Sequence, residues 1–187
     1  MRFTKLPGTT IEATITTGAA DRQLTSLFSC GGLVLSQVCQ LTGLEGYTIQ
    51  NWMQRKFLSS PIKKKYTRHQ LCRIFNINLL KDTFTLEQAV TLLGHINGNL
   101  DDTGDDIIDD SQLYAYLVDC LAVQNCSDCL DLSRVGETVR AVTADYHNLH
   151  RSAEIRLRLV LEIMLTTCQA QQIQHRALEM FGRLDSM

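Results

Sequence analysis

Apolar residues recur every three or four positions through most of the chain, a spacing that places them along one face of an α-helix. Continuous alternation of apolar and polar residues, the sign of a half-buried strand, is not sustained anywhere. The pattern therefore predicts a mostly α-helical, all-α protein. The expected helices lie at about 22–28, 35–42, 47–55, 67–80, 85–97, 111–124, 132–146 and 151–181.

The segment around Gly43 has the spacing of a helix-turn-helix. Glycine permits a turn with positive φ, and Cys39, four residues earlier, is small enough for two helices to approach closely. Thr42 stands where an aliphatic residue is usual. Four apolar residues are spaced to fill the wedge between the helices: Val38, Leu44, Ile49 and Trp52.

Two helix starts are marked by capping boxes. Thr67 precedes Gln70 by three residues, and Thr85 precedes Gln88 by the same interval, each just before an apolar run. Between the helix that contains Trp52 and the first of these caps, the stretch KFLSSPIKKKY contains Pro61, which cannot continue a helix. We expect a turn or short hairpin that carries the three lysines.

The helical patterns and their breaks predict four parts of the chain. A Thr-rich N-terminal segment forms an arm, and the stretch GNLDDTGDDIIDD breaks the periodicity as an acidic linker. The predicted parts are an arm at 1–28, a winged helix-turn-helix with a short wing at 29–97, the acidic linker at 98–110, and a helical C-terminal dimerisation or effector domain at 111–187.

The last helical pattern is unusually long. From Ile155 to Leu165 it is apolar on nearly every face, so more than one side should be buried. A helix over 151–181 is longer than a compact domain of this size holds comfortably. We therefore expect it either to break near Thr166–Gln172 or to protrude and pair with a second chain.

Charge is segregated along the sequence although the formal net charge is only −2. Seven basic residues and no acid lie between Arg55 and Arg73, whereas nine acids and no Lys or Arg lie between Asp82 and Asp119. A block of one sign indicates a local partner of the opposite sign, so the first block favours an anionic partner.

Composition indicates a cytoplasmic protein. The chain has 187 residues, of which 44% are hydrophobic, so it can bury a core. Its seven cysteines and the absence of an apolar leader are typical of reduced thiols in the cytoplasm. No run approaches the ~18 apolar residues of a membrane span.

Several motifs resemble the DNA-binding half of MerR-type winged helix-turn-helix regulators: LSQVCQLTGL, YTIQNWMQRKFLS, KKKYTRHQL and FTLEQAVTLL. The stretches TGLEGYTIQNW, INGNLDDTGDDII and SQLYAYLV look, more closely, like a Gram-positive bacterial family classed only as a domain of unknown function, over about residues 30–118. The first resemblance implies a winged reader of double-stranded DNA.

If Ile49, Trp52 and Met53 face inward, the opposite face of that helix carries Gln and Asn, which can make bidentate contacts to adenine. Nearby cations would neutralise phosphates, and Tyr66 would add a hydroxyl contact to a phosphate. The expected DNA-binding residues are Tyr47, Gln50, Asn51, Gln54, Arg55, Lys56, Lys63, Lys64, Lys65, Tyr66 and Arg68.

These observations predict a sequence-specific transcriptional regulator that works as a homodimer, and they leave open whether it takes an effector. Dimerisation is expected because palindromic sites match two-fold proteins. One alternative is a protein-docking adaptor, since helix-turn-helix units also bind proteins. No phosphate loop, nucleophile elbow or metalloprotease motif is present, so we expect neither an enzyme nor a bound cofactor.

Two stretches of the sequence offer possible metal ligands. A calcium loop over Asn99, Asp101, Thr103, Gly104 and Asp105 has the glycine in place, but its last position is Asp110 rather than Glu. A second alternative is a metal or redox sensor through Cys126 and Cys129, with His147 and His150. The spacing matches no usual zinc finger, and Cys120 is expected in the core.

Overall fold

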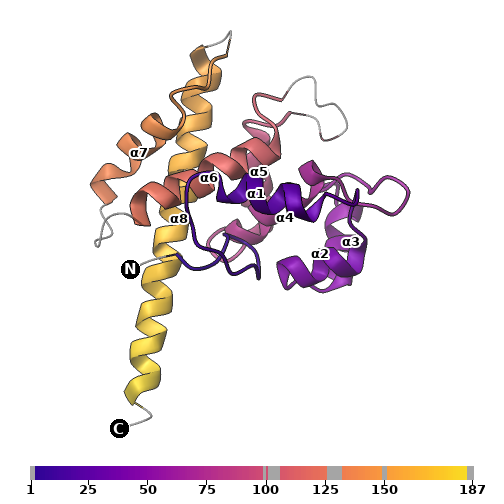
Figure 1. Cartoon of the computed structure of the whole chain (residues 1–187), viewed down its shortest axis with the longest axis horizontal. Coiled ribbons are helices and arrows are strands. Elements are labelled where there is room, and N and C mark those ends of the chain that lie inside the picture. Colours follow the sequence, from indigo (N-terminus) through magenta and orange to yellow (C-terminus); the bar gives the residue numbers. More distant parts are fainter. Residues whose placement is uncertain (1–2, 99, 101–105, 126–131, 149–150, 185–187) are drawn as a thin grey trace.

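The structure, a computed structural model, describes residues 3–98, 100, 106–125, 132–148 and 151–184. It is mostly helical, as the sequence predicts, and the described residues contain isolated β-bridges but no strand (Figure 1). The helices are α1 (Ala19–Leu27), α2 (Leu35–Thr42), α3 (Gly46–Gln54), α4 (Arg68–Leu80), α5 (Leu86–Gly94), α6 (Asp110–Asn125), the short 3₁₀ helix η2 (Leu132–Arg134), α7 (Val135–Val142) and α8 (Arg151–Leu184).

Helix α4 is the centre of the molecule. It packs against α2, α5, α6 and α8, and every residue from Gln70 to Leu80 is buried. The predicted capping box starts it: Thr67 Oγ1 accepts from the amide of Gln70, whose side chain accepts in turn from the Thr67 amide. Helix α5 begins in the same way at Thr85 and Gln88. Both predicted helix starts are confirmed.

Because α4 is enclosed on all sides, its polar residues need partners inside the protein. Arg73, 3% exposed, lies with its Nη1 3.7 Å from Oδ2 of Asp110, the first residue of α6. Asn76 donates to the other oxygen of Asp110 at 3.1 Å, and Arg73 donates to Asn97. The expectation that Arg73 belongs to a basic surface for an anionic partner is therefore wrong.

His69 extends this cluster to the surface. Its Nδ1 lies 2.7 Å from Asp109 and its Nε2 3.5 Å from Asp110. The hydrogen bond to Asp109 raises the pKa of His69. Burial raises the pKa of Asp110, whereas the nearby Arg73 lowers it. The end of the predicted acidic linker is thus a buried anchor between α4 and α6.

The N-terminal segment packs closely on the helices. Leu6 and Ile15 are buried, and the hydroxyl of Tyr114 on α6 donates to the carbonyl of Pro7 at 2.8 Å. Asn78 of α4 donates to the carbonyl of Gly8 at 2.8 Å. Through these contacts the segment joins α4 to α6 as a strap, which is partly exposed along its length.

One hydrophobic cluster extends from the N-terminal segment through α2, α3, α4 and α6 to α8. Helix α6 packs on α1 and α4 as well as on α7 and α8. The division of the chain into four parts stays a prediction, with bounds at 1–28, 29–97, 98–110 and 111–187. The described portions of these parts share this core.

Helix α8 is continuous over 34 residues, about 51 Å at 1.5 Å per residue. The expected alternative of a break near Thr166–Gln172 is wrong. Its first half is embedded beside α6 and α7, whereas its last turns extend away from the other helices (Figure 1). No helix among the described residues has the length and apolar character needed to cross a membrane.

Replacing Arg73 by Met should lower the free energy of unfolding by about 3 kcal/mol, because it leaves Asp110 buried without its cation. In the double variant R73M/D110N both charges are removed and the oxygen facing Asn76 is kept. We expect this variant to regain at least about 1 kcal/mol relative to R73M in urea unfolding. Additive losses would mean that the two side chains do not interact.

Candidate nucleic-acid interface

Helices α2 and α3 meet at Gly43, which has φ +70° and ends α2 with its amide bonded to the Cys39 carbonyl. A side chain is strained at this φ, which explains the glycine. Three of the four predicted wedge residues are buried: Val38 and Ile49 fully, and Trp52 with 3% exposed. Leu44 is partly buried against the same core.

The hydrogen bonds of Thr42 explain why a threonine stands where an aliphatic residue is usual. It is buried, and its hydroxyl donates to the Val38 carbonyl at 2.8 Å. The same oxygen accepts from the amide of Leu44 at 3.2 Å, across the turn. Its backbone carbonyl accepts from Asn78 of α4. Thr42 therefore ties the turn together and fixes it to α4.

The burial of Ile49 and Trp52 leaves the opposite face of α3 in solvent. The four predicted base-contacting residues are all exposed on this face, and Tyr47 has 73% of its surface free. The exposed residues are Tyr47, Gln50, Asn51 and Gln54. We call this set the amide face of α3.

A tight two-residue turn beside α3 carries the lysines. Ile62 and Lys65 exchange both backbone hydrogen bonds, at 3.0 and 2.9 Å, with Lys63 and Lys64 at the tip. Tyr66 then pairs with Leu33 and directs its hydroxyl to the sulfur of Met53 on α3, at 3.8 Å. The lysine turn (Ile62–Lys65) is thus held against α3, and the predicted hairpin is confirmed.

The backbone of this turn is strained. Lys63 has φ +49° and Lys64 φ +63°, and Lys56, just after α3, has φ +58°. Two-residue turns with positive φ at both central positions favour Asn-Gly, because other side chains clash with the backbone. Lysine in both positions costs stability, and strain of this kind is concentrated at functional sites. Sequence reasoning found the lysines but not this strain.

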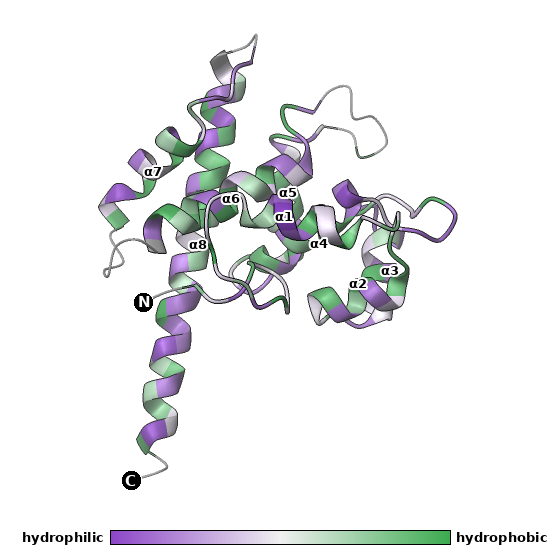
Figure 2. Ribbon diagram, viewed as in Figure 1, coloured by the Kyte–Doolittle hydropathy of each residue, from purple (hydrophilic) through white to green (hydrophobic). Residues whose placement is uncertain are grey.

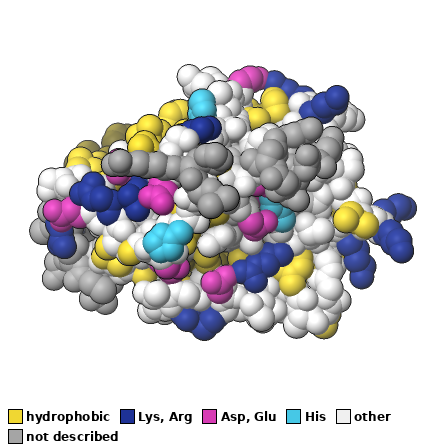
Figure 3. Space-filling view, turned by 90° about the horizontal axis from the view of Figure 1, so that it is seen from above, with side chains coloured by type: hydrophobic (Ala, Val, Ile, Leu, Met, Phe, Trp, Pro, Cys, Tyr) yellow, Lys and Arg dark blue, Asp and Glu magenta, His cyan; other side chains and the backbone are white. Residues whose placement is uncertain are grey.

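The cations of the predicted site fall into two groups. Arg55 pairs with Glu87 of α5 and lies 4.5 Å over the Phe57 ring, and Arg68 pairs with Asp21 of α1. The four lysines of the predicted site are exposed and make no ion pair with the described residues: Lys56, Lys63, Lys64 and Lys65. Figure 3 shows Lys and Arg side chains projecting at the right-hand end, the end that holds α2 and α3 in Figure 1.

Tyr66 requires a correction. Its side chain is 2% exposed and packs in the core, where burial raises its pKa. The expected hydroxyl contact from Tyr66 to a phosphate is therefore wrong. Its aromatic ring instead packs at the base of the lysine turn. The sequence alone does not tell whether Tyr66 is buried or exposed.

The metal alternatives fall mostly outside the described residues. The calcium candidates Asn99, Asp101, Thr103, Gly104 and Asp105 lie there, as do Cys126, Cys129 and His150. Cys120 is in the core, as predicted, and burial raises its pKa to about 12. Within the described ranges no group of three or more His, Cys, Asp or Glu side chains is placed to bind a metal.

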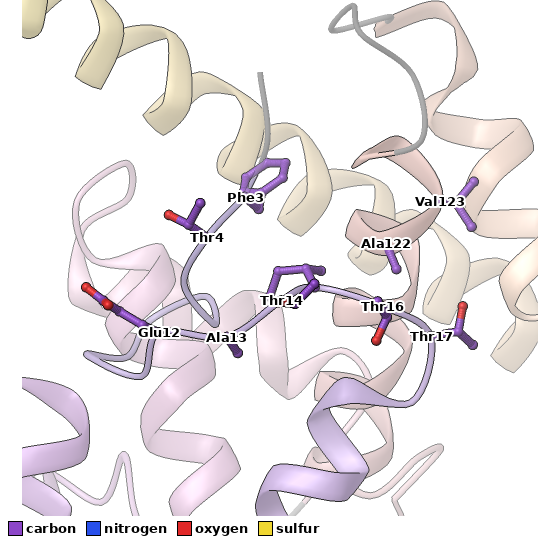
Figure 4. Close-up of a pocket in the computed structure, with 10 residues that line it drawn as sticks. Phe3, Thr4, Glu12, Ala13, Thr14, Thr16, Thr17, Ala122 and Val123 are labelled. Carbon is purple, nitrogen blue, oxygen red and sulfur yellow. The ribbon is translucent and has the colours of Figure 1, made fainter.

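A cavity of about 820 Å³ lies between the N-terminal segment and α6. Figure 4 shows Thr14, Thr16 and Thr17 on the N-terminal side and Ala122 and Val123 on α6. Among the described residues that line it, Glu12 is the one ionisable side chain, and the others are mostly apolar or threonine. The cavity has room for a small ligand.

The profile of a family described as Domain of unknown function (DUF1836) matches residues 23–117. The predicted likeness to such a family is confirmed. The chain is also similar to Uncharacterized protein YkrK of Bacillus subtilis (strain 168), with 24% identity over 156 residues that cover 78% of this chain and 67% of that protein. No solved structure matches the chain. The matched family segment contains α3 and the lysine turn and ends within α6.

Replacing Lys63–Lys64 by Asn-Gly should stabilise the protein, because these residues suit positive φ. We expect K63N/K64G to raise the free energy of unfolding by about 1 kcal/mol in urea titrations. The control K63A/K64A removes the same two charges but keeps the clash, so it should not gain stability. Equal unfolding free energies for the Asn-Gly and Ala-Ala variants would contradict the assigned strain.

Proposed function

We propose that this chain, which belongs to the family described as Domain of unknown function (DUF1836), is a sequence-specific DNA-binding transcriptional regulator. In this proposal α2 and α3 act as a MerR-like winged helix-turn-helix, and the lysine turn is its short wing. The observation that carries the proposal is the exposed amide face of α3 beside an unpaired, strained lysine turn.

The amide face suits the major groove of DNA. An α-helix fits that groove, and Gln and Asn side chains can bind adenine through two hydrogen bonds. Gln50 and Asn51 are exposed on the side of α3 opposite Ile49 and Trp52, which anchor the helix to the core. A rigidly held helix presents these amides without a large ordering cost on binding.

The lysines suit the phosphate backbone. Contacts to phosphates fix the register of a protein on the duplex but carry no sequence information themselves. Arg55 and Arg68 would join them only by exchanging Glu87 and Asp21 for phosphates. Such exchange costs little, because exposed ion pairs contribute about 0–1 kcal/mol each.

The pairing of Arg55, Arg68 and Arg73 within the protein leaves four lysines of the basic block without an ion pair to the described residues. The salt dependence of binding separates DNA from the docking-adaptor alternative.

The binding constant for labelled duplex DNA, measured by fluorescence anisotropy over a series of salt concentrations, should depend strongly on salt. Four neutralised phosphates per subunit give a slope of log K against log salt near roughly −3.6. K63N/K64G, although more stable, should reduce that slope to about −1.8 and weaken binding to all sequences.

Q50A and N51A form the matched controls, because they remove amide contacts without changing charge. They should keep the slope of the wild type and lose discrimination between DNA sequences. The proposal fails if the wild type does not bind duplex DNA at low salt. It also fails if K63N/K64G binds DNA as tightly and with the same slope as the wild type.

A further inference from the structure

A short segment, 57–61, leads from α3 to the lysine turn and belongs to no helix or strand. Leu58 in this segment is buried, and the amide of Phe57 donates to the Trp52 carbonyl at 2.9 Å. Figure 2 shows the loop that carries the turn at the right-hand edge, with hydrophilic residues around its tip. Ile62, the one apolar residue of the turn, is 66% exposed, so burial does not hold the turn in place.

The side chain of Gln70 bonds this segment to the start of α4. Its Nε2 donates to the Ser60 carbonyl at 2.8 Å, and to the hydroxyl and carbonyl of Ser59 at 3.0 and 3.2 Å. Its Oε1 accepts from the amide of Thr67 at 3.0 Å, a bond of the capping box. The nitrogen of the carboxamide thus faces acceptors and the oxygen faces a donor, which fixes the orientation of this group.

Gln88 shows that a capping box does not need the bonds to the serines. It holds the same position in the capping box of α5, where its Oε1 accepts from the amide of Thr85 at 3.0 Å. Gln88 is exposed, and its Nε2 donates to none of the described residues. The bonds from Gln70 to Ser59 and Ser60 are therefore additional to helix capping.

The lysine turn is held at both of its ends next to the start of α4. Before the turn, the segment 57–61 is bonded to Gln70. After it, Tyr66 exchanges backbone hydrogen bonds with Leu33 at 2.7 and 3.0 Å, and Thr67 is the N-cap of α4. The two lysines at the tip have positive φ, and a strained backbone persists only where the surrounding structure holds it.

We propose that Gln70 is a positioning residue for DNA binding, which holds the lysine turn where its lysines reach the phosphates. The inference rests on the proposed function. Gln70 is 5% exposed, so it acts through the turn and not by touching DNA. Its bonds fix the turn before DNA arrives, and less conformational freedom is then lost on binding.

A contact residue and a positioning residue affect the salt dependence differently. Loss of a lysine removes a phosphate contact, so the slope of log K against log salt falls. Loss of positioning leaves the lysines able to contact phosphates, but the turn must be ordered during binding. The affinity then falls by the same factor for every sequence, and the slope stays as in the wild type.

Hydrogen–deuterium exchange of the full chain without DNA tests the positioning by itself. Q70E keeps the acceptor of the capping box but replaces the donor with a second acceptor, which repels the carbonyls of Ser59 and Ser60. We expect the amides of 59–66 to exchange about 10-fold faster in Q70E than in the wild type. The amides of 74–80 in α4 should keep their protection. The matched control Q88E makes the same change in the α5 capping box and should leave 59–66 unchanged.

Binding to duplex DNA tests the role in function, with neutral variants so that no charge is added near the phosphates. Q70M removes the cap acceptor and the donor together, whereas its matched control Q88M removes a cap acceptor alone. Q70M should bind every duplex about 10-fold more weakly and keep the salt slope of the wild type. Q88M should bind as the wild type does. Urea unfolding checks that both variants are folded.

Unchanged exchange of 59–66 in Q70E would overturn the inference, even if the wild type binds DNA. Equal DNA affinities of Q70M and Q88M would also overturn it. A salt slope of Q70M as low as that of K63N/K64G would mean that phosphate contacts are lost, which contradicts a positioning role. A wild type that binds no DNA would overturn the proposed function, and the exchange experiment, which contains no DNA, distinguishes the two failures.

Discussion

The burial of α4 is the constraint on which the rest of the structure depends. A helix enclosed on all sides must find partners for its polar groups inside the protein, and Arg73 forms an ion pair with Asp110 at the start of α6. Asn78 of the same helix bonds the Thr42 carbonyl in the turn before α3 and the Gly8 carbonyl in the N-terminal segment. One helix therefore positions the turn that orients α3, the N-terminal strap and helix α6, which packs on α8.

The fold changes how the basic and acidic blocks of the sequence are interpreted. The basic and acidic blocks are separate along the sequence, yet in space they meet: Arg55 pairs with Glu87, His69 with Asp109 and Arg73 with Asp110. The basic block is thus partly neutralised inside the protein, and the cations left for an external partner are lysines at and near a single turn. The local, strained lysine turn is a more specific indication of an anionic partner than the basic block was.

Local signals were predictable from the sequence, and long-range ones were not. Thr67 and Thr85 mark helix starts because a cap bonds residues only three positions away, and Gly43 marks a turn because few residues tolerate its φ. Tyr66 and Arg73 were misassigned because polar side chains that find a partner far along the chain can be buried, and that partner is not visible in a local pattern. The positive φ of Lys63 and Lys64 had no signal either, since the residues that normally mark such a turn are absent.

The proposed function rests on the amide face of α3 and the lysine turn, which would together contact one DNA site. Its central claim is that the amide face meets bases, and selection of bound fragments from random duplex DNA tests this most directly. The account predicts enrichment of one adenine-containing motif, with enrichment lost for Q50A/N51A. Recovery of no common motif by the wild type, or of the same motif by Q50A/N51A, would contradict it.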